Sequence, residues 1–138
     1  MSNEATVRGS LQISTTNLKY RSYPTSFQAD VSGEVGPTPG AFSASTDGTD
    51  VDLTELTTPG LAIIKNLDAT NYVEVGIWDG LEFYPLIEIG PGEQYPVKLS
   101  RNIGNSYGTG TGTLGADTSM RIKADTAACV VVVEAFER

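Results

Sequence analysis

The stretch of residues 58–99, TPGLAIIKNLDATNYVEVGIWDGLEFYPLIEIGPGEQYPVKL, constrains the fold most because it alternates apolar and polar residues in short segments. Each segment ends at turn-forming residues, such as Pro59 with Gly60 and Asp79 with Gly80. Short alternating runs separated by such turns are typical of consecutive antiparallel strands with one packed face and one solvent face. The sequence therefore predicts an all-β protein.

Strand-like segments also flank this stretch, and helical periodicity is almost absent. The flanking strands are expected at residues 11–14, 18–21, 27–31, 41–44, 120–124 and 129–136. Short strands at this spacing predict an antiparallel β-sandwich, jelly-roll-like in architecture, rather than βαβ units. A chain of 138 residues has the length of one domain and can bury a core without disulfides.

Three segments depart from the strand pattern. Residues 1–10 are polar and are expected to form a flexible N-terminal arm, which leaves residues 11–138 as a single β-sandwich domain. Residues 32–40, SGEVGPTPG, have the composition of a linker or a crossover loop. Residues 101–118 form a long, Gly-rich loop, and loops of that length in compact domains are usually functional or mobile.

The central hairpin allows a prediction of strand register. A three-residue loop over residues 78–80 would pair Ile77 with Leu81 and Val75 with Phe83, and would place Gly80 at the left-handed position of a bulge. This register keeps the apolar face continuous. The expected core residues of the hairpin are Val73, Val75, Ile77, Leu81 and Phe83, with Trp78 at its tip.

Composition argues against several classes of function. The chain has no histidine, which removes the commonest general base and metal ligand, and its net charge of −8 disfavours nucleic acid as a partner. The single cysteine, Cys129, lies in an apolar run and is expected to be a buried hydrophobic residue. No signal peptide is visible, and no apolar run is long enough for a bilayer, so we expect a soluble protein made in the cytoplasm, without a membrane partner.

Three motifs with possible ligand or catalytic chemistry are better explained by ordinary structure. Residues 110–115 match G-x-G-x-x-G, but neither a preceding strand nor a following helix is expected there. Residues 47–52, DGTDVD, offer carboxylates for calcium, but their spacing is that of a turn rather than an EF-hand. Glu74, Glu82 and Glu88 are expected on the solvent face of a sheet rather than paired for glycoside hydrolysis. The sequence predicts no enzyme, no metal and no cofactor.

Aromatic residues are the candidate interface residues. Trp78 is expected at the hairpin tip, with Tyr72 and Tyr84 on the outward strand face and Tyr107 in the Gly-rich loop. Such side chains either anchor a protein partner, stack on sugar rings, or merely cover the edge of the sheet.

Four short segments carry a family resemblance: residues 57–60 (TTPG), 65–76 (KNLDATNYVEVG), 89–93 (IGPGE) and 122–128 (IKADTAA). Together they resemble a group of small β-rich proteins encoded among the virion structural genes of tailed bacteriophages. The resemblance covers residues 57–99 and 119–136 and implies a component of the virion.

We expect from this resemblance a capsid decoration (cement) protein, made in the host cytoplasm and bound to the major capsid protein or other virion proteins on the outer capsid surface. A homotrimer is expected, with residues 130–136 at the subunit interface because this strand is apolar on both faces. The alternatives are a tail, neck or baseplate subunit, and a host-surface carbohydrate-binding adhesin module.

Overall fold

The computed structural model describes residues 5–23, 25–29, 31, 35–100 and 118–138. The chain divides into two compact units, Met1–Ser32 and Gly33–Arg138, which we call the arm and the body. This division differs from the expected boundary after residue 10. The reason is that residues 5–9 are a strand that pairs with residues 25–29, so that residues 11–29 belong to the arm.

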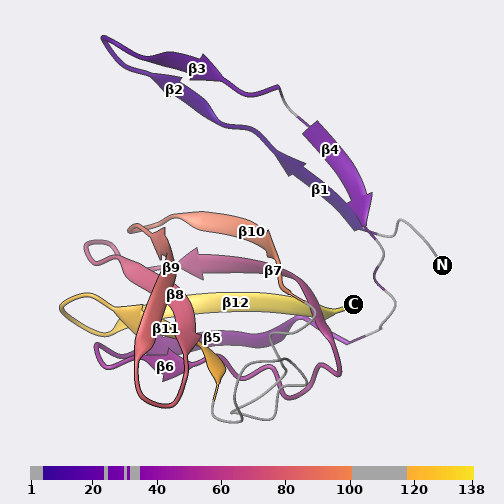
Figure 1. The fold of residues 1–138 in the computed structure, drawn as a ribbon, viewed down its shortest axis with the longest axis vertical. Helices are drawn as coiled ribbons and strands as arrows, with labels where there is room; N and C mark the ends of the chain where they lie inside the picture. The colour runs from indigo at the N-terminus through magenta and orange to yellow at the C-terminus, as the bar shows by residue number, and fades with distance from the viewer. Residues whose placement is uncertain (1–4, 24, 30, 32–34, 101–117) are drawn as a thin grey trace. The chain divides into compact units, whose positions relative to one another are not determined.

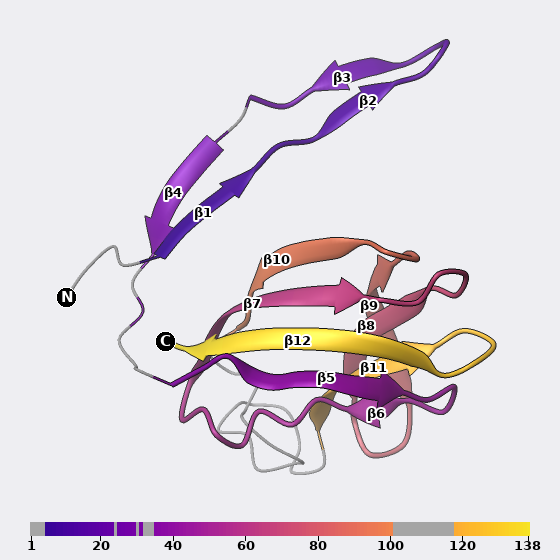
Figure 2. The same cartoon turned by 180° about the vertical axis from the view of Figure 1, so that it is seen from behind.

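The body contains two four-stranded antiparallel sheets, visible in Figures 1 and 2. One sheet has the strand order β10-β7-β12-β5 and the other the order β6-β11-β8-β9. The strands are β5 (Thr38–Ala44), β6 (Thr49–Asp50), β7 (Pro59–Asn66), β8 (Val73–Trp78), β9 (Phe83–Ile89), β10 (Gln94–Lys98), β11 (Ser119–Ala124) and β12 (Cys129–Glu137). The expected all-β, antiparallel sandwich is confirmed, whereas the Gly-rich loop lies outside the described residues up to position 117.

The core forms where the apolar faces of the two sheets meet. On β12 every second residue from Cys129 to Ala135 is buried, and on β11 Met120 and Ile122 are buried opposite them in the same cluster. Alternation with a period of two puts these side chains on one face of each strand, and the second sheet removes that face from water. The same pattern explains why the sequence located most body strands well.

The register of the central hairpin differs from the prediction. Trp78 pairs with Phe83 and Ile77 with Tyr84, so the connection is the four residues 79–82. The Asp79 carboxylate accepts hydrogen bonds from the backbone N–H groups of Leu81 at 2.8 Å and Glu82 at 2.7 Å. These side-chain bonds close the longer loop, which a pattern of apolar residues does not reveal.

A β-bulge in β9 then changes which residues of this strand face the core. The register shifts between Val75 and Gly76, which pair with Ile87 and Pro85, so that Leu86 is the extra residue. As a result Val73 and Val75 are buried as expected, but Ile77 and Phe83 are only half-buried. Leu81, which was expected in the core, is 85% exposed.

The arm is a long two-stranded ribbon. Its strands are β1 (Ala5–Gly9), β2 (Gln12–Ser14), β3 (Lys19–Arg21) and β4 (Thr25–Ala29). β1 pairs with β4 and β2 with β3, both antiparallel. Ala29 is the only buried apolar residue among the described positions of the arm. The expected flexible segment at residues 1–10 therefore contains a paired strand over residues 5–9.

Candidate interaction surfaces

Trp78 lies in β8 and one face of its ring is covered. The guanidinium carbon of Arg121 is 4.0 Å from the centroid of the indole ring, a cation–π contact. Arg121 is held in turn by Asp50, whose Oδ1 accepts hydrogen bonds from Arg121 Nε at 2.7 Å and from Ser119 Oγ at 2.8 Å. This group of side chains ties the two-residue strand β6 to β11 and β8, and its charges are already paired.

The structure does not bring the three predicted aromatic residues together. Tyr72 precedes β8 and lies six residues from Trp78, which corresponds to roughly 20 Å along a strand. Its pKa is raised, chiefly by the neighbouring Asp125 carboxylate. Tyr84 pairs with Ile77 and donates its hydroxyl to Asp79 Oδ2 at 3.1 Å, so it belongs to the hairpin end. Tyr107 lies outside the described residues.

The acidic candidates do not form a metal site or a catalytic pair in the described part of the chain. Asp50 is bonded to Arg121, and Asp52 accepts hydrogen bonds from Thr54, which lower the pKa of its carboxyl. Glu82 and Glu88 are exposed, as expected, whereas Glu74 is half-buried. No group of three or more His, Cys, Asp or Glu side chains with metal-binding geometry occurs among residues 5–100 and 118–138 that are described. The G-x-G-x-x-G match at residues 110–115 lies outside them.

The polar motif at residues 66–71, which carries part of the resemblance, builds a turn. Asn66 is buried and its amide nitrogen donates to the carbonyl oxygens of Asn71 at 2.8 Å and Ile89 at 3.1 Å. Asp68 Oδ1 accepts the backbone N–H groups of Thr70 and Asn71, which lowers the pKa of that carboxyl. Each polar side chain of this motif is therefore occupied in shaping the β7–β8 connection.

Strand β9 and the loop before it carry exposed apolar side chains at the edge of a sheet. We define the β9 surface by Leu81, Tyr84, Leu86 and Ile87, of which Leu81 is 85% and Leu86 71% exposed. β9 is the terminal strand in the order β6-β11-β8-β9, so among the described residues no strand pairs with its outer side. Large exposed apolar groups on an edge strand and in the loop before it are typical of an interaction surface. The sequence did not reveal this surface because the predicted register placed Leu81 inside.

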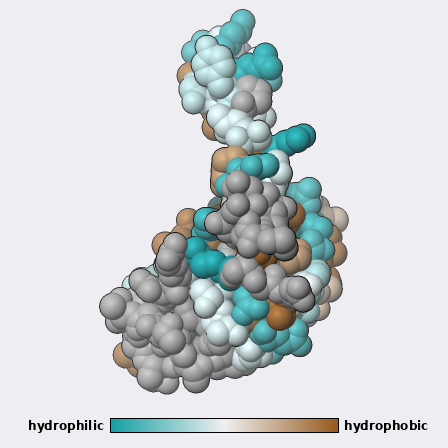
Figure 3. Space-filling model, turned by 90° about the vertical axis from the view of Figure 1, so that its right-hand side faces the viewer, coloured by the Kyte–Doolittle hydropathy of each residue, from teal (hydrophilic) through white to brown (hydrophobic). Residues whose placement is uncertain are grey.

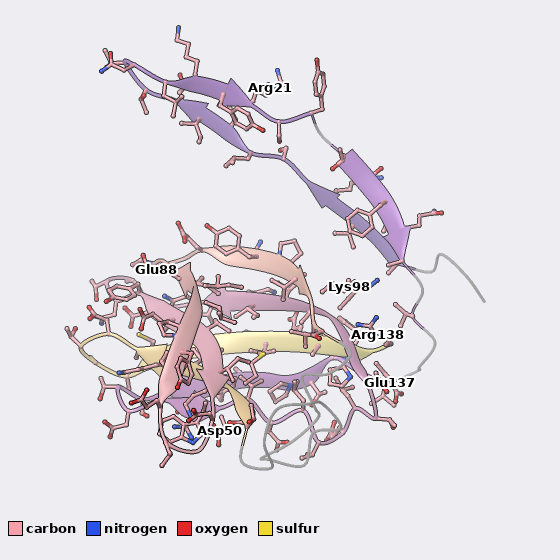
Figure 4. All side chains as sticks on the ribbon, in the orientation of Figure 1. Arg21, Asp50, Glu88, Lys98, Glu137 and Arg138 are labelled. Atoms are coloured by element: carbon pink, nitrogen blue, oxygen red, sulfur yellow. The ribbon has the colours of Figure 1, made fainter. Side chains whose placement is uncertain are left out.

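The β9 surface is also acidic. Residues 79–89 include Asp79, Glu82 and Glu88 and contain no lysine or arginine. Glu88 lies directly opposite Glu74 on β8, and like charges in such positions repel. Figure 4 labels Glu88 on β9 and Asp50 on β6, the two edge strands of the same sheet. At one edge the carboxylate is paired with arginine, and at the other edge the carboxylates lie among exposed apolar side chains.

A second surface covers the outer face of β12. Val130 is 50% exposed, Val132 is half-buried, and Phe136 is 36% exposed, while Lys65 and Glu134 form an ion pair at 3.4 Å across the same face. On the side of the molecule drawn in Figure 3, brown apolar residues are scattered among teal polar ones. Val130, Val132 and Phe136 therefore leave apolar surface accessible on the outer face of β12.

The molecule is therefore an antiparallel β-sandwich with an attached β-ribbon and two surfaces suited to protein contacts. Comparisons with protein-family models, with curated proteins and with solved structures gave no match. None of the described residues form a helix long and apolar enough to cross a membrane.

Proposed function

We propose that this chain is a structural protein of a bacteriophage virion, namely a capsid decoration (cement) protein that assembles in many copies on the outer capsid surface. The observation that carries the proposal is the arm. It presents Leu11, Leu18, Tyr20, Tyr23 and Phe27 to solvent, and Ala29 is the one buried apolar residue among its described positions.

A two-stranded ribbon is at best marginally stable alone in water, because it has no second layer to cover its apolar face. Such a ribbon becomes stable when it lies on another protein surface. A protein that reinforces a shell needs a compact body and an extension that reaches a neighbour, which is the division found between the body and the arm. The resemblance of residues 57–99 and 119–136 to virion proteins supports the same proposal.

The body supplies a second element of the proposal, a homotrimer formed through the outer face of β12. Val130, Val132 and Phe136 give this face an apolar centre, and the Lys65–Glu134 pair gives it a polar group that can align subunits. The proposed trimer would cover the exposed part of these side chains.

The copy number in purified virions tests the proposed function. Quantitative mass spectrometry should find hundreds of copies, in a simple ratio to the major capsid protein. A few copies in multiples of three or six would instead indicate a tail, neck or baseplate subunit. Absence from the virion would contradict every virion role.

Capsid occupancy of variants tests the part played by the arm. The double variant Tyr20→Ser with Phe27→Ser should lower occupancy at least about tenfold if the arm carries binding energy of the usual size for aromatic anchors. The control Ser26→Ala changes an exposed polar residue on β4 and should leave occupancy unchanged. Equal occupancy of the two variants would argue against a role for the arm. For the adhesin alternative, the isolated protein would bind host glycans, and Trp78→Ala would abolish that binding.

A further inference from the structure

We infer that the arm of one copy docks on the β9 surface of a second copy, so that neighbouring copies are joined head to tail. This inference names a partner for the arm and so rests on the proposal that the protein assembles in many copies. It differs from the proposed trimer contact through β12, and it can be measured on the purified chain.

The arm has one apolar side along β1 and β2, the two strands that lead away from its N-terminal end. Residues 5, 7, 9, 11 and 13 are Ala, Val, Gly, Leu and Ile, whereas residues 6, 8, 10, 12 and 14 are all polar. The partners on the return strand follow the same division, since Phe27 lies opposite Val7 and Tyr20 opposite Ile13. Because side chains alternate across a strand, the described part of the arm presents an apolar face, on which Leu11, Tyr20 and Phe27 are more than half exposed.

The ribbon of the arm is also basic, and with Glu4 and Asp30 the whole arm, residues 1–32, has a net charge of +1. Residues 5–29 contain Arg8, Lys19 and Arg21 and no aspartate or glutamate. Figure 4 shows Arg21 on β3 of the arm. The strands of a ribbon are only about 5 Å apart, so long Lys and Arg side chains can extend past its rim toward a surface under its other face. An apolar face with cations at its rim is therefore available for an acidic, apolar partner.

The body has the opposite charge. Residues 33–138 carry fifteen acidic and six basic residues, a net charge of −9. On the β9 surface Asp79 and Glu82 are close in sequence to Leu81 in the loop, Glu88 follows Leu86 on the strand, and no cation occurs within residues 79–89. Two β9 surfaces would repel each other because both are acidic. The arm supplies an apolar face that can cover the exposed leucines, together with the positive charge that the β9 surface lacks.

Side chains, rather than a continued ladder of backbone hydrogen bonds, would make this contact. Pro85 lies within β9 and has no N–H to donate, which limits pairing with a further strand along its edge. A contact between two different surfaces is heterologous, and it closes into a ring or continues as a chain of copies.

Mixing two single-surface variants gives a specific test. Both test variants also carry Val130→Asp, which removes the proposed trimer contact through the outer face of β12. On that background the donor variant Lys19→Glu with Arg21→Glu should lose self-association, and so should the acceptor variant Leu81→Ser with Leu86→Ser. Each variant retains the surface that the other lacks. We therefore expect the mixture to form one-to-one dimers that do not grow further, measured by sedimentation velocity over a range of protein concentrations.

Controls and salt sharpen the result. The variant Lys98→Glu reverses one charge at an exposed position on β10 of the body, half the charge change of the donor variant, and should associate like the natural chain. Raising the salt concentration from 0.05 to 0.5 M should weaken association about tenfold, because exposed charges are screened. Circular dichroism and urea unfolding establish that every variant has a folded body.

Three outcomes would overturn the inference: a chain with Val130→Asp alone that stays monomeric up to millimolar concentration, donor and acceptor variants that associate as that chain does, or a mixture that remains monomeric. An arm already protected from trypsin in the dilute monomer would indicate docking within one copy, and would also overturn it. None of these results bears on the copy number in virions, so the proposed function stands or fails separately.

Discussion

The body and the arm share one sequence pattern but differ in how far their apolar side chains are buried. In both, apolar and polar residues alternate along antiparallel strands. In the body a second sheet covers the apolar faces, and Ile122, Val131 and Val133 are completely buried. In the described part of the arm the paired strands form a single layer, and Phe27 is 54% exposed. Alternation thus specifies that a segment is a strand, whereas burial depends on a partner layer that the pattern does not identify.

The energetic consequence is large. Complete burial of a Val, Leu, Ile or Phe side chain contributes about 1.5–3 kcal/mol to folding. The body gains this contribution at many positions, and the arm gains it at almost none. We therefore expect the body to unfold cooperatively and the isolated arm to open locally.

Limited proteolysis should show the largest difference. In dilute full-length protein, trypsin should cleave after Arg8, Lys19 and Arg21 in the arm roughly a hundredfold faster than after Lys65 in the body, because local opening of the ribbon requires little free energy. Mass spectrometry of the fragments over time gives both rates. Equal rates at arm and body sites would mean that the two units have similar stability.

Truncation of a core residue should have the next largest effect. Ile122 is completely buried on β11, so Ile122→Ala should lower the free energy of unfolding by about 2–5 kcal/mol, measured with urea. Phe27→Ala removes a larger side chain from the arm and should leave the unfolding of the body unchanged. A large effect of Phe27→Ala would show that the arm packs on the body of its own chain.

Two glycines provide a matched pair of smaller changes. A side chain at Gly76 would collide with the backbone carbonyl of Tyr84 at the bulge, whereas a side chain at Gly9 in the arm meets no atom within 4 Å. We expect Gly76→Ala to destabilise the body by about 1–3 kcal/mol, as forced overpacking does. Gly9→Ala should be close to neutral. The same urea titration measures both, and a neutral Gly76→Ala would argue against the observed register.

The smallest expected effect is a pH dependence confined to the body. Hydrogen bonds lower the pKa values of Asp68 and Asp79 in the folded chain. A lowered folded pKa stabilises the fold at pH values above the unfolded value of about 3.9, and this contribution is lost as the pH falls below it. Asp68→Asn should therefore reduce the loss of stability between pH 5 and pH 2, measured as urea midpoints. An unchanged slope would mean that the Asp68 bonds contribute little.

Much of the fold could be predicted from the sequence, and the candidate surfaces largely could not. The strands around Ile64, Val75, Ile122 and Val131 were predictable because both sheets bury one face of a simple alternation. The central hairpin was predicted wrongly, since the Asp79 side chain closes a longer loop and the Leu86 bulge restores the phase of β9.

The arm and the β9 surface were not predicted from the sequence for a different reason. Strand pairing between residues 5–9 and 25–29 is a long-range contact, and residues 1–10 contain no strong strand signal by themselves. Trp78 was predicted to be exposed at the hairpin tip. In the structure Arg121 covers one face of its ring, because β11 lies next to β8 in the sheet. Such placements depend on strand order, which short sequence patterns do not encode.

The position of Cys129 has a practical consequence. Its thiol is the only one in the chain, is completely buried, and donates a weak hydrogen bond to the Ala127 carbonyl oxygen at 3.4 Å. Burial raises the pKa of this thiol and so slows its reaction with alkylating reagents. The rate at which Cys129 is alkylated therefore measures how often the sandwich opens. Because the arm has no cysteine, this rate reports on the body alone, even in an assembly where optical signals from the two units overlap.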